Sequence, residues 1–396
     1  MIPIVILPKG RGYSTVALYV TSGGGDEPIG KTGISHLLEH MLMATNKIMK
    51  ETSKRGIKSN AGTSEAWGNY WFSTPSEHVI YCLEHLVGIA ENKSFGNLSV
   101  EKNAVKQELT SLLGSHAQRV DHAIFTELFP NTGLARCSDT ALHLKNLEAF
   151  TLRTLKNYYT ENYPGKMFIA ISLGSDVNSR TVNYINRLKK VSPPKWTISK
   201  VPRMIPTTNK IVHVQMKDTK NSECSLVFYT PPRIPADRDA LDLIGLILGG
   251  GMESLLMKVL RRSMKMVYSV RCRQAVEPEG TILKVSWHCQ SRNVDKCKEA
   301  VYRVLATFNP ANMDGNRKVL IENISRNLNE STRSIVKSYG HQFASRGKAV
   351  SLQKRIARLE KLKSGDLRSL VKMFYNKDRS FLVHISNKKR GPTITI

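Results

Sequence analysis

The sequence has no long apolar run and only a few cysteines. No stretch of its 396 residues approaches the 18 or more apolar residues of a membrane-spanning helix. The cysteines, six in number, show no paired spacing: Cys82, Cys137, Cys224, Cys272, Cys289 and Cys297. We interpret them as free thiols, which excludes a disulfide-framed module and favours a reducing compartment such as the cytoplasm or the mitochondrial matrix.

We do not expect the first residues to be a leader. Residues Met1–Pro8 enter a strand-like segment directly, without the charged start and long apolar stretch of a signal peptide. The segment is also not an arginine-rich transit peptide. Earlier removal of a presequence would leave the same chain, so that alternative stays open.

Acidic residues are scarce relative to basic ones. The chain has 59 Lys and Arg against 32 Asp and Glu, a formal net charge of +27. Basic residues are denser in 258–265, 348–368 and 387–390. One interpretation is a set of solvated faces; the other, of equal weight, is attraction to an acidic partner such as nucleic acid, anionic lipid or acidic peptides. The charge is also compatible with a viral or particle-associated origin, although no aromatic-interleaved nucleic-acid motif accompanies it.

The most informative motif is the pentapeptide His36-Leu-Leu-Glu-His40, which lies in an apolar run without a helix breaker after Gly33. On a helix, His36 and His40 are one turn apart on the same face, so both imidazoles can bind one Zn²⁺. The carboxylate of Glu39 lies beside them, where it can take a proton from a metal-bound water. The alternative is a buried helix whose histidines bond to backbone carbonyls. It is less favoured because buried ionisable groups are costly unless a metal compensates them.

A catalytic zinc site needs a third protein ligand, and the segment Ser99–Thr110 offers one. Glu101 and Glu108 are seven residues apart, almost two helical turns, and share a stripe with apolar residues. Lys102, Asn103, Lys106 and Gln107 supply the solvated face of the same helix. We therefore interpret Glu108 as the third ligand and Glu101 as the residue that orients a ligand or the water.

These residues resemble the M16 family of zinc metallopeptidases, the pitrilysin, insulinase and mitochondrial processing peptidase group. The resemblance covers nearly the whole chain and is closest to the short two-domain members. The matching segments occur in the family's order: Gly33–Met41 for the zinc helix, Ser59–Ser64 for the Asn-Ala-x-Thr strand, Glu101–Thr110 for the distal glutamate helix, and Leu248–Ser254, Leu260–Arg261 and Tyr268–Val270 for the second half.

The chain departs from the family pattern at several places. The segment between His40 and Glu108 is shorter than usual, and Met43–Asn46 replaces the Gly-Thr that normally follows the zinc helix. Lys265 stands where a glycine is common. These departures concern the shape of the substrate groove and leave the expected ligands in place.

The two halves of the chain have similar layouts. Val16–Thr21 alternates like a strand, Ser225–Thr230 is also predicted to be a strand, and each precedes a helical segment. We expect an α+β fold of two tandem homologous domains, and the resemblance implies α/β sandwiches of the LuxS/processing-peptidase metalloenzyme type. The predicted domains are a catalytic zinc domain at residues 1–190 and a domain without zinc at 209–396, joined by a Pro- and Lys-rich linker at about 190–208.

The resemblance also implies the site and its partners. One Zn²⁺ per chain would be bound, and Asn60 and Ala61 would lie on a sheet edge that accepts a peptide substrate as an added strand. Arg261 and Tyr268 would grip the substrate and stabilise charge on the scissile carbonyl, although spacing alone favours a surface arginine and a core tyrosine. Family enzymes enclose substrate between four such domains, which implies a homodimer or a heterodimer with a related chain.

Three classes of function follow from the sequence. The leading hypothesis is a zinc-dependent endopeptidase that acts on extended or unfolded peptides, with Glu39 as general base. The second is a non-catalytic structural subunit of a large assembly that retains the peptidase fold. The third is a basic protein associated with nucleic acid or a virion-like particle. The intact motif favours the first class over the second.

Overall fold

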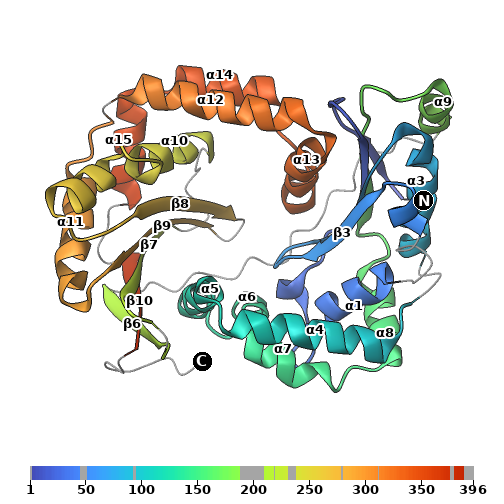
Figure 1. Cartoon of the computed structure of the whole chain (residues 1–396), viewed down its shortest axis with the longest axis horizontal. Helices are drawn as coiled ribbons and strands as arrows, with labels where there is room; N and C mark the ends of the chain where they lie inside the picture. Colours follow the sequence, from blue (N-terminus) through green and yellow to red (C-terminus); the bar gives the residue numbers. More distant parts are fainter. Residues whose placement is uncertain are drawn as a thin grey trace. The chain divides into compact units, whose positions relative to one another are not determined.

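The computed structural model describes residues 2–44, 51–91, 95–187, 209–217, 219–230, 238–277, 280–310, 312–374 and 379–387 (Figure 1). The predicted linker at about 190–208 lies wholly outside these residues. Contacts divide the chain into two compact units. Unit 1 contains Met1–Gly114, Asn131–Lys200 and Ile324–Val350, and unit 2 contains Ser115–Pro130, Val201–Asn323 and Ser351–Ile396.

Unit 1 is built on a five-stranded sheet. In spatial order its strands are β1 (Ile4–Ile6), β5 (Met167–Ser172), β2 (Ser14–Val20), β4 (Gly68–Thr74) and β3 (Lys58–Thr63). Only the β1–β5 pair is parallel. Every residue of β2 is buried, because helices cover both faces of the sheet at this strand.

The helices of unit 1 surround this sheet. They are α1 (Ile34–Met43), α3 (Val79–Ala90), α4 (Leu98–Leu113), α6 (Gly133–Cys137), α7 (Thr140–Leu147), α8 (Leu152–Asn162), α9 (Ser179–Arg187) and α13 (Thr332–Arg346), with the short 3₁₀ turns η1 (Gly24–Asp26) and η2 (Ser76–His78). Helix α13 packs on β2 and β5, and α3 also packs on β2.

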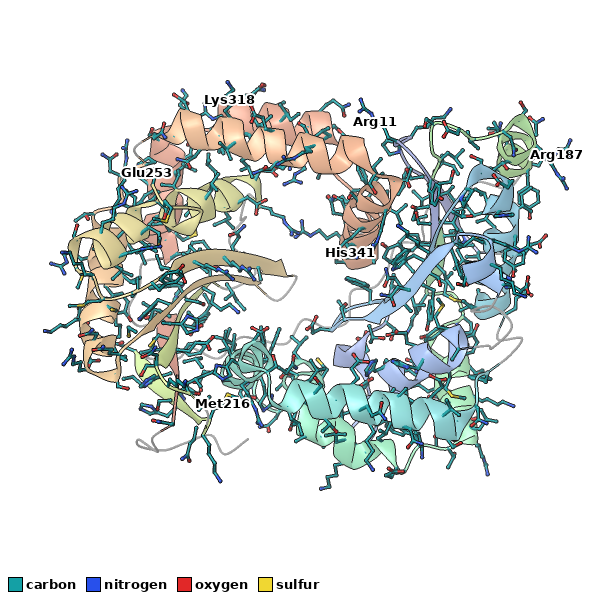
Figure 2. All side chains as sticks on the ribbon, in the orientation of Figure 1. Arg11, Arg187, Met216, Glu253, Lys318 and His341 are labelled. Carbon is teal, nitrogen blue, oxygen red and sulfur yellow. The ribbon has the colours of Figure 1, made fainter. Side chains whose placement is uncertain are left out.

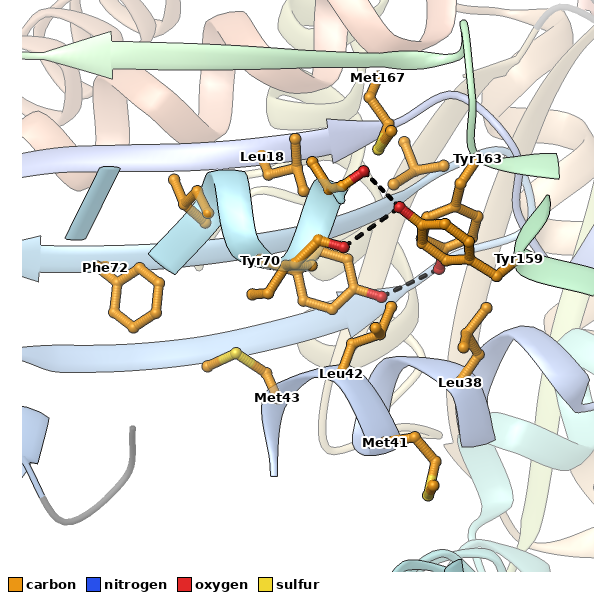
Figure 3. Packing of buried hydrophobic residues seen from close by; sticks show 14 of the residues in the cluster. Leu18, Leu38, Met41, Leu42, Met43, Tyr70, Phe72, Tyr159, Tyr163 and Met167 are labelled. Atoms are coloured by element: carbon orange, nitrogen blue, oxygen red, sulfur yellow. Dashed lines mark hydrogen bonds between the residues drawn. The ribbon is translucent and has the colours of Figure 1, made fainter. Parts of the chain in front are cut away.

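The main core of unit 1 lies between the sheet and α1 (Figure 3). Leu38 and Leu42 of α1 are buried against Tyr70 of β4 and Tyr163. The hydroxyls of these two tyrosines lie 3.0 Å apart in a hydrogen bond, so the buried polar atoms are satisfied. Each fully buried leucine stabilises this packing by about 1.5–3 kcal/mol. The core therefore holds α1 firmly against the sheet, with its histidines on the opposite face.

Unit 2 has a sheet with an equivalent strand order. Its strands are β6 (Lys210–Gln215), β10 (Ser380–Ser386), β7 (Ser222–Thr230), β9 (Gly280–Cys289) and β8 (Val270–Glu277). The β6–β10 pair alone is parallel. Its helices are α5 (His116–Leu128), α10 (Arg238–Gly249), α11 (Val294–Ala306), α14 (Leu352–Lys361) and α15 (Ser364–Phe374), with η4 (Ser291–Asn293) and the π-helical η3 (Met257–Ser263); α12 (Met313–Glu330) crosses the boundary at Ile324.

The shared strand order confirms the predicted duplication of an α+β domain. The grouping by contacts nevertheless differs from two consecutive halves, because each sheet is covered by one helix from the other half of the sequence. Helix α5 packs on β6 and β10, and α13 packs on β2 and β5. An amphipathic pattern shows that a helix must bury one face, but not which sheet it covers. The boundaries at 190 and 209 stay a prediction.

Among the described residues, every helix is too short or too polar to cross a membrane. This agrees with the absence of a long apolar run in the sequence.

Candidate metal centre

The N-terminus of helix α1 is capped by residues that precede the helix. Gly33 precedes its first residue with a φ of 95°, a left-handed conformation that glycine adopts without strain. The carboxylate of Glu27 accepts hydrogen bonds from the backbone N–H groups of Gly33 at 2.7 Å and Ser35 at 2.8 Å. It thereby satisfies two donors that a helix leaves unpaired at this end. This cap fixes the position of the first turn, which carries His36.

His36, His40 and Glu108 come together as one cluster. The Nε2 atoms of His36 and His40 each lie 3.5 Å from Oε2 of Glu108. The three ligand atoms all lie within 4.8 Å of one another. A tetrahedral zinc ion with ligands at 2.0–2.1 Å requires ligand separations of about 3.3 Å, and the two histidine–carboxylate distances of 3.5 Å are close to this value. The donor set, two imidazoles and one carboxylate, also fits zinc.

Glu39 lies beside this cluster without joining it. Its Oε2 accepts a hydrogen bond from the Thr63 hydroxyl at 2.7 Å, and the residue is only 9% exposed. Burial raises the pKa of the Glu39 carboxyl, and the nearby His36 imidazole and the Thr63 bond oppose this effect without cancelling it. A carboxylate with a raised pKa is a stronger base than a solvated one.

Glu101 belongs to α4 and lies next to His40 of α1. Its Oε2 is 3.4 Å from Nδ1 of His40, and the residue is buried. The ring nitrogen that faces Glu108 is the other one, Nε2. A carboxylate at Nδ1 holds the imidazole so that Nε2 presents its lone pair toward the cluster. The orienting role of Glu101 stays a prediction, and this placement allows it.

Charges within the cluster shift the pKa values of its members. The hydrogen bond from His36 lowers the pKa of Glu108, against the smaller effect of partial burial. Burial lowers the pKa of His36, but the bond to Glu108 and the charges of Glu39 and Glu108 outweigh it, so the net pKa is raised. Histidine and carboxylate thus attract each other strongly when no cation lies between them.

A cavity of about 520 Å³ opens over these residues. The edge strand β3 forms one side of it, from Ser59 to Thr63, and Figure 1 shows β3 beside α1. Asn60 is exposed and Ala61 half-buried, and the Asn60 side chain accepts a hydrogen bond from the Ala61 N–H at 2.9 Å. Both residues predicted to bind substrate therefore line the same cavity as the histidines.

Arg261 and Tyr268 belong to unit 2. The Arg261 guanidinium carbon lies 4.8 Å from the centre of the Tyr268 ring, and that tyrosine is 80% exposed. The structure therefore brings these two predicted residues to each other. Arg261 lies in the π-helical η3, and strand β8 begins at Val270, two residues after the tyrosine. Such an exposed tyrosine differs from the core tyrosine that spacing alone favours.

Two residues of the site had no role assigned from the sequence, although Thr63 belongs to the segment matched to the Asn-Ala-x-Thr strand. Thr63 shares a sheet face with Ser59 and Ala61 because strand side chains alternate, and this period of two was a usable signal. Glu27 had no comparable signal. It reaches Gly33 and Ser35 through the fold of the intervening loop, and its spacing from α1 does not match a standard capping pattern.

Comparison with known proteins agrees with this geometry. Two sequence models of one peptidase family match the chain in succession. The model described as insulinase (peptidase family M16) matches residues 5–138, and that described as peptidase M16 inactive domain matches residues 149–311. The first range contains the whole cluster of histidines and glutamates. The second covers much of unit 2.

One relative and two solved structures extend the similarity over nearly the full length. Uncharacterized zinc protease YmxG of Bacillus subtilis is 22% identical over 383 residues, 92% of this chain and 90% of that protein. A protease structure from Helicobacter pylori gives a TM-score of 0.80 at 18% identity, covering 97% of this chain and 96% of that chain. A chain of complex III2 from Candida albicans gives 0.76 at 12% identity, covering 96% and 93%. The chain is thus a short, two-domain member of peptidase family M16.

Proposed function

We propose that this protein is a zinc-dependent endopeptidase that hydrolyses peptide bonds in extended or unfolded peptides. The observation that carries the proposal is the convergence of three ligand atoms beside a separate, buried carboxylate. Three protein ligands leave a fourth position for water, as catalytic zinc sites require. When bound, zinc activates this water and polarises the scissile carbonyl.

Each residue of the cluster has one proposed task. His36, His40 and Glu108 hold one Zn²⁺ per chain, and Glu101 orients the His40 ring. Glu39 takes the proton from the attacking water and later passes it to the leaving amine. The hydrogen bond from Thr63 fixes one oxygen of Glu39, so the other oxygen stays available for the proton.

Strand β3 is the proposed binding site for the peptide. It is an edge strand of the sheet, and its residues line the cavity over the histidines. An extended peptide can pair with its backbone through main-chain hydrogen bonds, with little regard to side chains. A helical peptide cannot do so, because its backbone groups are already paired.

The proposed working unit is a dimer with a second copy or a related chain. Arg261 and Tyr268 of one chain would bind substrate and stabilise the charge that develops on the carbonyl oxygen at the zinc site of the other. The contact between these side chains and the exposure of the tyrosine support a paired role. The six free cysteines support the proposal of a reducing compartment.

A structural role without catalysis is the second candidate. The similarity to a chain of complex III2 favours it, since that chain is solved within a large assembly. The third candidate, association with an acidic partner such as nucleic acid, is supported only by the net charge of +27. A steep decrease of RNA or DNA binding with salt concentration would distinguish it.

The test is metal analysis paired with a cleavage assay on unstructured peptides. We expect about one zinc per chain, loss of cleavage after chelation, and recovery when Zn²⁺ is restored. Stoichiometric zinc without cleavage of any peptide in a diverse mixture would contradict the peptidase and support the structural role. Cleavage that persists in the metal-free protein would contradict the zinc mechanism.

A further inference from the structure

A second pocket of unit 1 lies on the other face of the sheet. Side chains of β2 alternate, so Val16 and Leu18 enter the main core while Thr15 and Tyr19 face α13. The cavity there measures about 250 Å³. We call it the Trp–Arg pocket, and the residues that define it are Tyr19, Trp67, Trp71, Arg333, Lys337 and His341.

Helix α13 supplies all the basic residues of the Trp–Arg pocket. Arg333, Lys337 and His341 follow one another at four-residue spacing, which places them on one helix face. The helix is held close to β2 by Tyr19, whose hydroxyl donates to the Val336 carbonyl at 3.1 Å. These contacts fix the direction in which the three basic side chains project.

Close approach of α13 depends on a glycine. A Cβ atom at Gly340 would lie only 2.3 Å from the Tyr19 ring, far inside van der Waals contact. At the start of the helix, the hydroxyls of Thr332 and Thr15 lie 2.8 Å apart in a hydrogen bond. Helix α13 therefore contacts β2 closely at two points, Gly340 and Thr332, and the Trp–Arg pocket lies beside these contacts.

Aromatic rings face the basic residues. The Arg333 guanidinium carbon lies 4.0 Å from the centre of the Trp71 ring. The centres of the His341 and Trp67 rings also lie 4.0 Å apart, with their planes at an angle of 34°. Figure 2 labels His341 on α13. Stacking on an aromatic ring orients a guanidinium but leaves its N–H edge able to bind an anion.

The charge of the Trp–Arg pocket is uncompensated within the part of the chain that the structure describes. No carboxylate lines it, and no described Asp or Glu forms an ion pair with Arg333 or Lys337. Both side chains are exposed at the rim. A pocket with unpaired cations and aromatic walls is complementary to an anionic group carried on an apolar stem.

The size and position of the pocket restrict its ligand. Its volume is below the roughly 300–1,000 Å³ of sites for drug-sized ligands, so it suits a side chain or a chain end. Asn60 of the edge strand pairs directly with Trp71 and shares its sheet face. A peptide paired with β3 would place every second side chain on this face, roughly 10 Å from the Trp71 backbone. The long stem of Arg333 can span the remaining distance.

We propose that the Trp–Arg pocket binds a carboxylate of the extended peptide that pairs with β3, and so selects acidic peptides. This inference rests on the peptide-binding part of the proposed function. Two sources share this chemistry, an Asp or Glu side chain and the free C-terminal carboxylate. Two observations carry the inference: no carboxylate among the described residues pairs with Arg333 or Lys337, and Asn60 and Trp71 share one sheet face.

The test measures peptide binding without cleavage. Fluorescence anisotropy is recorded with the zinc-loaded Glu39→Gln chain and three extended peptides of one sequence. The first peptide has an internal Glu and an amidated C-terminus. The second has Gln at the position of that Glu and keeps the amidated C-terminus. The third has the same Gln and a free C-terminus. We expect one carboxylate-bearing peptide to bind about five- to tenfold more tightly than the amidated Gln peptide, and which one does so identifies the source.

Further variants assign this preference to the pocket. Arg333→Gln/Lys337→Gln should reduce the preference to less than about twofold, while Arg333→Lys/Lys337→Arg should retain most of it. Lys145→Gln/Arg153→Gln removes the same charge from exposed positions of unit 1 and should leave the preference intact. Equal zinc content and equal circular dichroism spectra check that each variant is folded.

Equal affinity for the three peptides, or a preference that survives Arg333→Gln/Lys337→Gln, would overturn the pocket proposal. Absence of peptide binding would overturn it as well. These outcomes are separate from failure of the peptidase. Wild-type protein that cleaves the peptides without a carboxylate preference refutes only the pocket. A pocket-dependent preference in a chain that never cleaves them refutes only the catalytic proposal.

Discussion

The Thr63 hydroxyl of edge strand β3 donates a hydrogen bond to the Glu39 carboxylate of α1, with 2.7 Å between Oγ1 and Oε2. This contact joins the strand proposed to bind substrate to the residue proposed to act as base. The bond involves Oε2 of Glu39, and the other carboxylate oxygen, Oε1, does not take part in it. It also opposes the effect of burial, because the hydrogen bond lowers the pKa that burial raises.

Replacing Thr63 by Val removes this hydroxyl at nearly constant volume. We expect kcat to decrease about tenfold while zinc content stays unchanged, since the ligands are intact. The pKa of Glu39 should increase, so the acid limb of the kcat/KM profile moves to higher pH. Thr63→Ser keeps the hydroxyl and serves as the control. Loss of zinc in Thr63→Val, or an unmoved acid limb, would argue against this role.

Glu27 makes the stability of the protein depend on pH. Burial raises the pKa of its carboxyl from an ordinary 4.5 to about 7, although the bonds from Gly33 and Ser35 oppose this. Between these values the folded protein retains a proton that the unfolded chain has lost, so this group makes folding less favourable as pH increases. Glu27→Gln has no such proton. From pH 5 to pH 8 the stability of wild type relative to Glu27→Gln should therefore decrease, by at most about 3 kcal/mol.

Urea unfolding of both metal-free proteins at pH 5 and pH 8 measures this difference. Using metal-free protein separates the cap of α1 from any effect of zinc on stability. A wild-type stability that increases relative to Glu27→Gln at pH 8, or a difference that is the same at both pH values, would contradict the assignment.

Pairing with β3 requires an extended peptide. A peptide locked into a helix by a side-chain crosslink should be cleaved at least tenfold more slowly than the same sequence with an open crosslink. The reason is that its backbone donors and acceptors are already paired. Chromatographic assay of the two peptides in parallel gives the ratio. Efficient cutting of the locked helix without unfolding would exclude strand addition.

The proposed dimer can be tested by mixing two inactive chains. One carries His36→Ala, and the other carries Arg261→Ala/Tyr268→Phe. Recovered cleavage in the mixture would indicate that the arginine and tyrosine of one chain serve the zinc site of another. Each variant alone is the control. Full activity of a monomer, established by sedimentation under assay conditions, would refute the dimer.

Much of the fold follows from local sequence patterns. Alternation predicted the strand at Val16–Thr21, and the structure has β2 at Ser14–Val20. The apolar run after Gly33 predicted the helix that forms α1. The fold of two tandem α+β domains is confirmed. The packing of α5 and α13 could not be predicted, because a helix pattern defines the face that is buried but not the sheet that buries it.

Some residues of the site could also be predicted from the sequence, while others depend on the fold. Spacing on one helix is fixed by helix geometry, so the amino-acid sequence alone suffices to group His36, Glu39 and His40. Glu108 required a second helix with its own apolar stripe. The bond from Glu27 to Ser35 depends on the path of a loop, for which no periodicity exists. The Trp–Arg pocket depends on the packing of α13, which lies more than 250 residues from Trp71 in the sequence.

In the proposed site, His36, His40 and Glu108 hold zinc, and Glu39 acts only as a base. The most direct test of these roles is zinc content and cleavage rate of Glu39→Gln, with His40→Ala and Glu108→Gln measured in parallel. We expect Glu39→Gln to retain about one zinc per chain while cleavage decreases at least 100-fold. His40→Ala should lose zinc, and Glu108→Gln should bind it more weakly. If Glu39→Gln lost zinc as completely as His40→Ala, the assignment of roles would be wrong.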